Sequence, residues 1–356
     1  MSPGRTHRSL SYVALVTSAI PLFLGLSGVF CCDALAAPFI YAAVTLDDKV
    51  AVIDTANDTV LTSIPVPHLP VSIATNDVGN RVYVGSAATS NVSVIDTLAN
   101  AVIDTIAVAH APVSMAYVAA NQRLYVSDDA GIAVIDTTTN ALVSRINGVG
   151  TTSYCDSIAA SHAGNRIYMA GTGEHGNGYV WVIDTSNDSV VASVPVFSYP
   201  CAVAVAPDDS AVYVTPGNNP QIPLAMLVLH TADNSVNSTG FTPNGWDSSI
   251  VLNSTGTRMY IPSGVELLQV VDPATGELKE PMLLAPPAFP SSSAYAYGAV
   301  IVAEADKLYV ADSDSNTVSV GDLKTQLYLH AVTVGYFPNG LAVVSIIDKI
   351  FKAGFD

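Results

Sequence analysis

The chain has 356 residues, of which 50% are apolar and only 12% are charged, and its formal net charge is −17 at pH 7. Ordinary globular chains are about 25% charged, so this composition favours strands that are buried on both faces. The scarcity of lysine and arginine argues against a nucleic-acid partner, because phosphate backbones are bound mainly by basic side chains.

The first 36 residues are predicted to be a signal peptide. A basic start is followed by an uncharged apolar run, Leu10–Phe30, and by the small-x-small sequence Ala34-Leu35-Ala36. This order of basic, apolar and small residues is typical of a secretory signal. We expect cleavage after Ala36, which leaves a periplasmic or secreted protein without a membrane span. The basic residues are Arg5, His7 and Arg8.

Two other interpretations of this segment remain open. The apolar run is long enough to cross a bilayer, so the segment could stay in place as an uncleaved anchor. Cys31 suggests a lipoprotein. However, Phe30 is too large for the position before a lipidated cysteine, which argues against lipidation.

An apolar-Tyr-apolar triplet recurs seven times along the rest of the chain. Successive tyrosines are 42, 42, 43, 45, 47 and 49 residues apart. About a dozen residues after each tyrosine comes a Val-Ile-Asp-Thr segment or a degenerate copy of it. The seven tyrosines are Tyr41, Tyr83, Tyr125, Tyr168, Tyr213, Tyr260 and Tyr309, and the four full copies end at Asp54-Thr55, Asp96-Thr97, Asp136-Thr137 and Asp184-Thr185.

Each repeat is predicted to contain four short strands. In the second repeat these are Val71–Thr75, Arg81–Gly85, Asn91–Asp96 and Ala101–Val108, with turn-forming residues between them. Four strands every 42 residues or so is the spacing of a propeller blade. The chain is therefore predicted to be all-β, a seven-bladed β-propeller with four-stranded antiparallel blades.

The ring is predicted to close by pairing of the two ends of the chain. The repeats begin with a second strand, Phe39–Val44, and end with an unpaired first strand, Leu341–Ile346, after the loop Tyr336-Phe337-Pro338. These two strands should complete one blade, which removes an open sheet edge. The propeller should span residues 37–347, and residues 348–356 form a C-terminal tail.

From Phe39 to Ile347, the repeats resemble the YVTN family of β-propeller repeats, which includes surface-layer-type repeats. The shared features are the Tyr-Val strand, the Val-Ile-Asp-Thr strand, a Gly-x-x-Pro loop and a Pro-Asp-Gly-like turn. The second to fourth blades match best. The fifth and sixth depart from the pattern, at His230 and in the proline-rich segment Pro286–Tyr295. The resemblance implies a propeller used as a scaffold.

The repeated Asp-Thr pairs and tyrosines are interpreted as structural. Asp and Thr side chains hydrogen-bond to the backbone of tight turns, and a turn is needed in every blade, whereas catalysis needs one asymmetric site. The buried tyrosines should each have one partner for the hydroxyl group. Function is therefore expected in loops that differ between blades.

By blade topology, the connections from fourth to first strand and from second to third strand lie on one face, here called the loop face. The sequence places on it the candidate ligand-binding residues His68, His110, Tyr154, Glu174, His175, Tyr199, Trp246 and Tyr336, with the acidic residues Asp128, Asp129, Asp312 and Asp314.

Histidine and glutamate side chains could ligate a transition metal or act as acid and base. These residues do not have the spacing of a known metal motif, so no metal or other cofactor is predicted. The segment Asp312–Asn316 begins like a calcium loop, but Thr317 and Leu323 stand where that loop needs Gly and Glu. The chain also lacks a phosphate-binding Gly-rich loop, a nucleophile elbow and a haem-attachment motif.

Cys155 and Cys201 open the first strands of the fourth and fifth blades. They are candidates for a disulfide, provided that their Cα atoms lie within about 7 Å of each other. The alternative is that both are buried thiols.

The leading functional hypothesis is a monomeric, exported binding scaffold whose loop face takes a protein, peptide, glycan or small-molecule ligand. One alternative is a lactonase-like hydrolase or lyase, in which His68, His110, Glu174 and His175 converge at the channel mouth. Another is a cell-envelope or surface-layer component. The sequence favours binding over catalysis.

Overall fold

The computed structural model describes residues 37–150, 157–217, 224–243, 249–262, 267–284 and 296–345, which belong to one compact unit. Their regular structure is β, apart from the 3-10 turns η1 (Thr45–Asp47), η2 (Glu174–Gly176) and η3 (Ala303–Ala305). None of the described segments forms a helix of the length and hydropathy needed to cross a membrane.

The strands form seven four-stranded antiparallel sheets, the blades. The first blade has the order β28-β1-β2-β3, and each of the others is built from four consecutive strands. The first blade contains β28 (Pro338–Val344), β1 (Phe39–Val44), β2 (Lys49–Asp54) and β3 (Thr59–Pro65), and the second contains β4 (Pro70–Thr75), β5 (Arg81–Ser86), β6 (Asn91–Asp96) and β7 (Ala101–Ala107). The third blade contains β8 (Ser114–Val118), β9 (Arg123–Asp128), β10 (Gly131–Asp136) and β11 (Ala141–Asn147), and the fourth contains β12 (Ser157–Ala160), β13 (Arg166–Thr172), β14 (Gly178–Asp184) and β15 (Ser189–Pro195). The fifth blade contains β16 (Pro200–Val205), β17 (Ala211–Pro216), β18 (Leu227–His230) and β19 (Val236–Ser238). The sixth blade contains β20 (Val251–Leu252), β21 (Met259–Pro262), β22 (Leu267–Val271) and β23 (Met282–Leu283). The seventh blade contains β24 (Ala296–Val302), β25 (Lys307–Asp312), β26 (Thr317–Asp322) and β27 (Leu327–Thr333).

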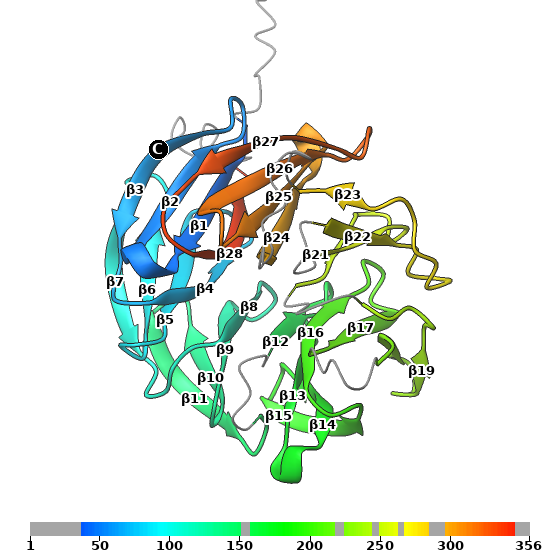
Figure 1. Cartoon of the computed structure of the whole chain (residues 1–356). Helices are drawn as coiled ribbons and strands as arrows, with labels where there is room; N and C mark the ends of the chain where they lie inside the picture. Colours follow the sequence, from blue (N-terminus) through cyan, green and yellow to red (C-terminus); the bar gives the residue numbers. More distant parts are fainter. Residues whose placement is uncertain are drawn as a thin grey trace, which may run out of the picture. The chain divides into compact units, whose positions relative to one another are not determined.

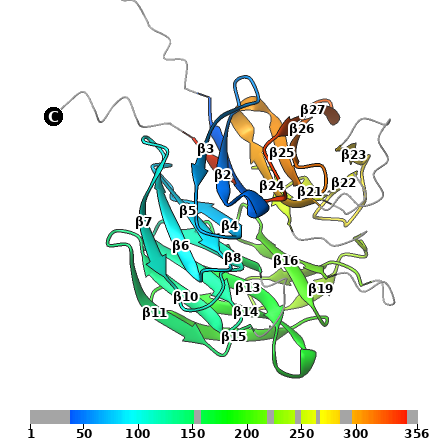
Figure 2. The ribbon, with the colours of Figure 1, turned by 60° about the vertical axis from the view of Figure 1, so that its left-hand side comes forward.

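The blades are arranged in a ring with their first strands toward the axis (Figures 1 and 2). Neighbouring first strands contact one another: β4 with β8, β8 with β12, β12 with β16, β20 with β24, β24 with β28, and β28 with β4. Between the fifth and sixth blades, Ala202 and Ala204 pack in one cluster with Ile250. The predicted seven-bladed β-propeller is therefore confirmed.

The hydrophobic core is divided into layers between adjacent blades. The cluster between the seventh and first blades contains Ile40, Ile53, Tyr309 and Val320, all fully buried. Equivalent clusters fill the other six interfaces among the described residues. The middle strands are buried on both faces, whereas the outer strands, such as β3, are mostly exposed. This burial on both faces accounts for the low content of charged residues.

The ring closes as predicted, through pairing of the two ends of the chain. Strand β28 pairs antiparallel with β1, and Tyr41 lies opposite Ala342. The prediction placed the start of the closing strand at Leu341, but β28 begins at Pro338. Proline is tolerated here because it is the first residue of the strand and the register shifts just beyond it.

The second blade has the four strands predicted, with boundaries within one residue. In the sixth blade, by contrast, β20 and β23 have only two residues each. This is one of the two blades in which the repeat sequence had departed from the pattern.

The Asp-Thr pairs are turn residues, as predicted. In the second blade, Asp96 accepts a hydrogen bond from the Leu98 N–H at 2.9 Å, and Thr97 donates to the Gly79 carbonyl at 2.8 Å. Thr55, Thr137 and Thr185 make equivalent hydrogen bonds to backbone carbonyl groups. Thr97, Thr137 and Thr185 thus join the third-to-fourth turn of their blade to its first-to-second connection, whereas Thr55 joins that turn to Pro38, just before β1.

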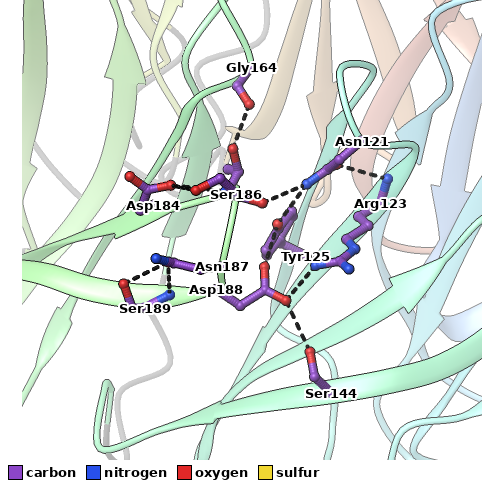
Figure 3. A network of polar contacts seen from close by, with 11 residues as sticks. Asn121, Arg123, Tyr125, Ser144, Gly164, Asp184, Ser186, Asn187, Asp188 and Ser189 are labelled. Carbon is purple, nitrogen blue, oxygen red and sulfur yellow. Dashed lines mark hydrogen bonds and ion pairs between the residues drawn. The ribbon is translucent and has the colours of Figure 1, made fainter.

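Three of the repeated tyrosines, Tyr41, Tyr125 and Tyr309, hydrogen-bond through the hydroxyl group to the following blade. The hydroxyl of Tyr41 donates to Asn100 Oδ1 at 2.5 Å, and that of Tyr125 donates to Asp188 Oδ1 at 2.8 Å. Figure 3 shows Asp188 also accepting from Arg123 and Ser144. Burial, together with the hydrogen bond to Asp188, raises the pKa of Tyr125 to about 12. For these three tyrosines, the expected hydroxyl partner is therefore supplied by the following blade.

Candidate functional site

The loop face is held by hydrogen bonds between its two kinds of connection. In the first blade, the Thr45 and Leu46 N–H groups donate to the carbonyl oxygens of Phe337 and Tyr336. The second-to-third connection, η1, therefore lies against the fourth-to-first connection that enters β28. The topology predicted for the loop face is confirmed at this point.

Three fourth-to-first connections share an unusual backbone conformation just before the proline of the next blade. Leu69, Tyr199 and Phe337 have φ angles of 57°, 59° and 62°, a region that is unfavourable for residues other than glycine. The Leu69 N–H donates to Asp48 Oδ1 and the Phe337 N–H donates to Asn316 Oδ1, both at 3.1 Å. These bonds hold the loops in a defined conformation.

His68 forms an exposed pair with an aspartate of the first blade. Its Nδ1 lies 2.9 and 3.0 Å from the two carboxylate oxygens of Asp48. The Leu69 N–H and His68 both hydrogen-bond to this carboxylate, and they hold the pKa of Asp48 below its ordinary value. Asp48 thus fixes the loop backbone and the histidine ring together.

His110 forms a similar pair in a different place. Its Nδ1 lies 3.0 Å from Asp129 Oδ1, in the connection between β9 and β10. The loop of His68 joins the first blade to the second, and His68 pairs with Asp48 of the first blade. The loop of His110 joins the second blade to the third, and His110 pairs with Asp129 of the third blade. Each histidine therefore has its own aspartate partner, and the two pairs belong to different blades.

His175 and Tyr199 lie on neighbouring connections of the fourth and fifth blades. His175 is in η2 with a φ of 64°, and the hydroxyl of Tyr199 lies beside Gly176. The Tyr199 side chain is exposed, and its backbone carbonyl accepts from the Gly217 N–H at 2.7 Å.

Tyr336 is the most exposed of the predicted aromatic residues that the structure describes. It is 64% accessible, while its backbone N–H donates to Asp47 Oδ2 at 3.2 Å. Asp47 also pairs with Lys49 at 2.9 Å, and this hydrogen bond is the largest of the effects that lower the pKa of Asp47.

The remaining predicted site residues are not fully described. Tyr154, Trp246 and Cys155 lie outside the described residues, and so does the side chain of Glu174. The convergence of His68, His110, Glu174 and His175 therefore stays a prediction. Cys201 is disulfide-bonded, but its pairing with Cys155 also stays a prediction.

Within the described part of the chain, one group of at least three side chains has ligand atoms close enough together for a metal ion. It consists of His110, Asp128 and Asp129, whose ligand atoms all lie within 4.8 Å of one another. The sequence places all three residues on the loop face, but the spacing of His110 and Asp128 along the chain gives no indication that they meet.

The opposite face, formed by the first-to-second and third-to-fourth turns and here called the turn face, carries two adjoining hollows that the sequence did not predict. Their volumes are about 670 and 550 Å³, and both are lined by Ala160 and His162. In the wall of the larger hollow, Tyr117 donates to Asp77 at 3.2 Å. Burial, with the nearby Asp77 charge, raises the pKa of Tyr117 to about 12.

His162 is held in place by the next blade. Its Nδ1 lies 3.1 Å from Asp209 Oδ1, and Asp209 also accepts from the N–H groups of His162 and Ala163. Burial alone would raise the pKa of Asp209, but the hydrogen bonds from Ala163 and His162 outweigh it and lower that pKa. These polar groups bond to one another between blades, so they are explained by blade packing.

No known family model and no curated protein sequence matches the chain. Similar solved structures include Kuenenia stuttgartiensis hydrazine synthase, with a TM-score of 0.66 and 18% identity over 83% of this chain and 98% of that one. A functionally unknown protein from Desulfotomaculum acetoxidans DSM 771 has a TM-score of 0.69 and 15% identity, covering 86% and 99% of the two chains.

A third similar structure is the dihydro-heme d1 dehydrogenase NirN in complex with DHE. It has a TM-score of 0.60 and 13% identity, over 83% of this chain and 63% of that one. At such identities the similarity concerns the fold and carries no information on activity. The chain is a seven-bladed β-propeller scaffold.

Proposed function

We propose that the protein is an exported β-propeller scaffold that binds a basic peptide or protein segment through its loop face. The observation that carries this proposal is the presence of both exposed tyrosine rings and exposed carboxylates on the loop face. Tyr199 and Tyr336 are 54% and 64% exposed. Tyrosine contributes a large apolar contact area and one polar group, which makes it common in binding surfaces.

The distribution of carboxylates supports a basic ligand. On the loop face, the side chains of Asp48 and Asp129 are 43% and 63% exposed, and each faces a histidine. Among the described residues, neither of these two aspartates forms an ion pair with a lysine or an arginine. The loop face therefore has carboxylates that can attract a cation, and a cation over a tyrosine ring gains about 0.5–1 kcal/mol.

Export is proposed from the first 36 residues, where a basic start, an apolar run and a small-x-small sequence follow one another. N-terminal sequencing of the protein recovered from outside the cytoplasm tests this proposal. A mature chain that begins at Ala37 supports it, and a chain that retains Met1 contradicts it.

Membership of the YVTN repeat family is also a proposal. It is supported by the tyrosine triplets and Asp-Thr strands of the sequence, together with the same structural role for these residues in successive blades.

A peptide array tests the binding proposal. It carries basic, neutral and acidic peptides of equal length, and the full-length protein is compared with a Tyr199→Ser/Tyr336→Ser variant. The matched control is Leu98→Ser/Leu327→Ser, because those side chains are 78% and 61% exposed near the turn face. We expect basic peptides to bind the wild type and the control, with at least a tenfold loss for the tyrosine variant. Equal binding by both variants, or equal binding of acidic peptides, would contradict the proposal.

A further inference from the structure

The three side chains of His110, Asp128 and Asp129 come together where two loops of the loop face meet. His110 lies between β7 and β8, Asp128 is the last residue of β9, and Asp129 follows it. One ligand atom from each lies within 4.8 Å of the other two.

Asp128 is unusual because its carboxylate is fully buried and only half satisfied. Its Oδ1 accepts from Arg145 and from the Ala130 N–H, the latter at 2.8 Å. Its Oδ2 is buried and has no hydrogen-bond partner. The Nη1 of Arg145 is also buried without a partner, and it makes no hydrogen bond to this oxygen. A buried carboxylate oxygen without a partner is unfavourable by about 1–3 kcal/mol or more, so Asp128 Oδ2 has the capacity to bind a further positive group.

The other two side chains of the group are accessible from solvent. The side chains of His110 and Asp129 are 40% and 63% exposed. An ion could therefore reach the group from the loop face, with Asp128 at the bottom of the site and the other two ligands at its rim.

The spacing of His110 and Asp129 fits two ligands of one ion. Metal–ligand distances of about 2.0–2.2 Å place adjacent ligand atoms roughly 3 Å apart, and His110 Nδ1 lies 3.0 Å from Asp129 Oδ1. The mixture of imidazole and carboxylate groups suits divalent first-row transition metals.

The first blade contains a natural counterpart without the third ligand. His68 and Asp48 form the same kind of pair, with a separation of 2.9 Å. Three residues after the repeat tyrosine, however, the first blade has Val44, where the third blade has Asp128. Among the described residues of the loop face, a histidine–aspartate pair is thus present twice, and the buried carboxylate is added at one of the two places.

We propose that His110, Asp128 and Asp129 bind a divalent transition-metal ion, with Zn²⁺ and Mn²⁺ as the probe ions. Three protein ligands leave at least one coordination position for water or for a ligand on the loop face. Arg145 stays paired with Asp128 Oδ1 and offsets part of the negative charge, while the ion supplies the missing partner of Oδ2. Asp129 is also one of the two exposed carboxylates of the binding proposal, whereas the buried carboxylate of Asp128 is used only for the metal site.

Equilibrium dialysis of the full-length protein against Zn²⁺ or Mn²⁺, after treatment with a chelator, tests the site. The variants are His110→Ala and Asp129→Asn, which change exposed side chains and leave the pairing of Asp128 with Arg145 in place. The matched controls are His68→Ala and Asp48→Asn. Thermal unfolding of each variant verifies that it is folded.

We expect about one ion per wild-type chain for at least one of the two metals, with affinity at least tenfold weaker in His110→Ala and in Asp129→Asn. The controls should bind as the wild type does. Bound Mn²⁺ should also show an electron paramagnetic resonance spectrum that changes in these two variants and not in the controls. The proposal is wrong if neither metal binds saturably, if His110→Ala binds as the wild type does, or if His68→Ala weakens binding equally.

Discussion

The hydroxyl of Tyr309 donates a hydrogen bond of 2.5 Å to Asp58 Oδ1, and so joins two residues that are 251 positions apart. Tyr309 belongs to the seventh blade and Asp58 to the turn between β2 and β3 of the first blade. This interface joins the last blade to the strands at the start of the propeller, whose first strand β1 pairs with β28 to close the ring. The same kind of bond joins Tyr125 to Asp188 between the third and fourth blades.

Asp58→Ala should destabilise the protein by about 2–4 kcal/mol, because it removes the partner of a buried hydroxyl and of a partly buried ammonium group. Asp58 accepts from Tyr309 and Lys307, and His330 lies 3.2 Å away. Urea unfolding measures the change. A loss below about 0.5 kcal/mol would mean that these bonds contribute little to stability.

Asp188→Ala is the matched variant at an internal interface. It should destabilise the protein by a comparable amount, since Asp188 also bonds to a tyrosine and to a basic residue. Limited proteolysis should distinguish the two variants, because only Asp58→Ala weakens the interface that holds the ends of the chain. Identical cleavage patterns would contradict this difference.

Deletion of residues 338–356 should prevent formation of a stable monomer. It removes β28 and leaves the edge of β1 without a partner, and an unpaired edge favours aggregation. Deletion of residues 348–356 alone keeps β28 and should leave the melting temperature nearly unchanged. Size-exclusion chromatography and thermal unfolding measure both effects, and a folded monomer without β28 would contradict the importance of closure.

Asp312→Asn should increase stability at pH 7, and the increase should shrink as the pH falls toward 4. Burial, with the nearby charge of Asp314, raises the pKa of Asp312 despite hydrogen bonds from Ser315. Because the pKa of Asp312 is higher in the folded than in the unfolded state, ionisation of Asp312 destabilises the folded state. This destabilisation is absent below the unfolded pKa of about 3.9 and develops as the pH rises through the folded pKa. Melting temperatures from pH 4 to 7 test this.

Asp322→Asn is the control with the opposite sign. Hydrogen bonds from the Thr325 and Lys324 N–H groups lower the pKa of Asp322, so its ionised form stabilises the protein above the unfolded pKa. That stabilisation is lost as the pH falls through the lowered folded pKa. The variant should therefore be less stable at pH 7, with a difference that shrinks in acid. If both variants changed stability in the same direction, the opposite pKa shifts assigned to the buried Asp312 and to the turn residue Asp322 would be wrong.

Much of the fold could be predicted because the same residues recur in the same structural roles. The tyrosine spacing gave the number of blades, and the first and last strands could be matched because each lacked a partner within its own repeat. The start of β28 at Pro338 was missed, since proline next to a loop is a weak signal for a strand. The partners of the tyrosines were also not predictable, because Asn100, Asp188 and Asp58 lie in other repeats.

The loop face was harder to predict than the blades. The sequence indicated which loops differ from the repeat, but not that His68 pairs with Asp48 while His110 pairs with Asp129. The two histidines occupy equivalent positions before a proline, yet they turn toward different blades. Side-chain direction in a loop depends on contacts between blades, and a linear pattern does not contain these contacts.

The most direct test of the proposed binding surface is site-specific photo-crosslinking in the organism that produces the protein. A photoreactive phenylalanine derivative is placed at position 199 or 336 on the loop face, and at position 98 on the turn face as the control. We expect a discrete crosslinked product from positions 199 and 336 and none from position 98. A product from position 98 alone, or equal products from all three positions, would contradict it.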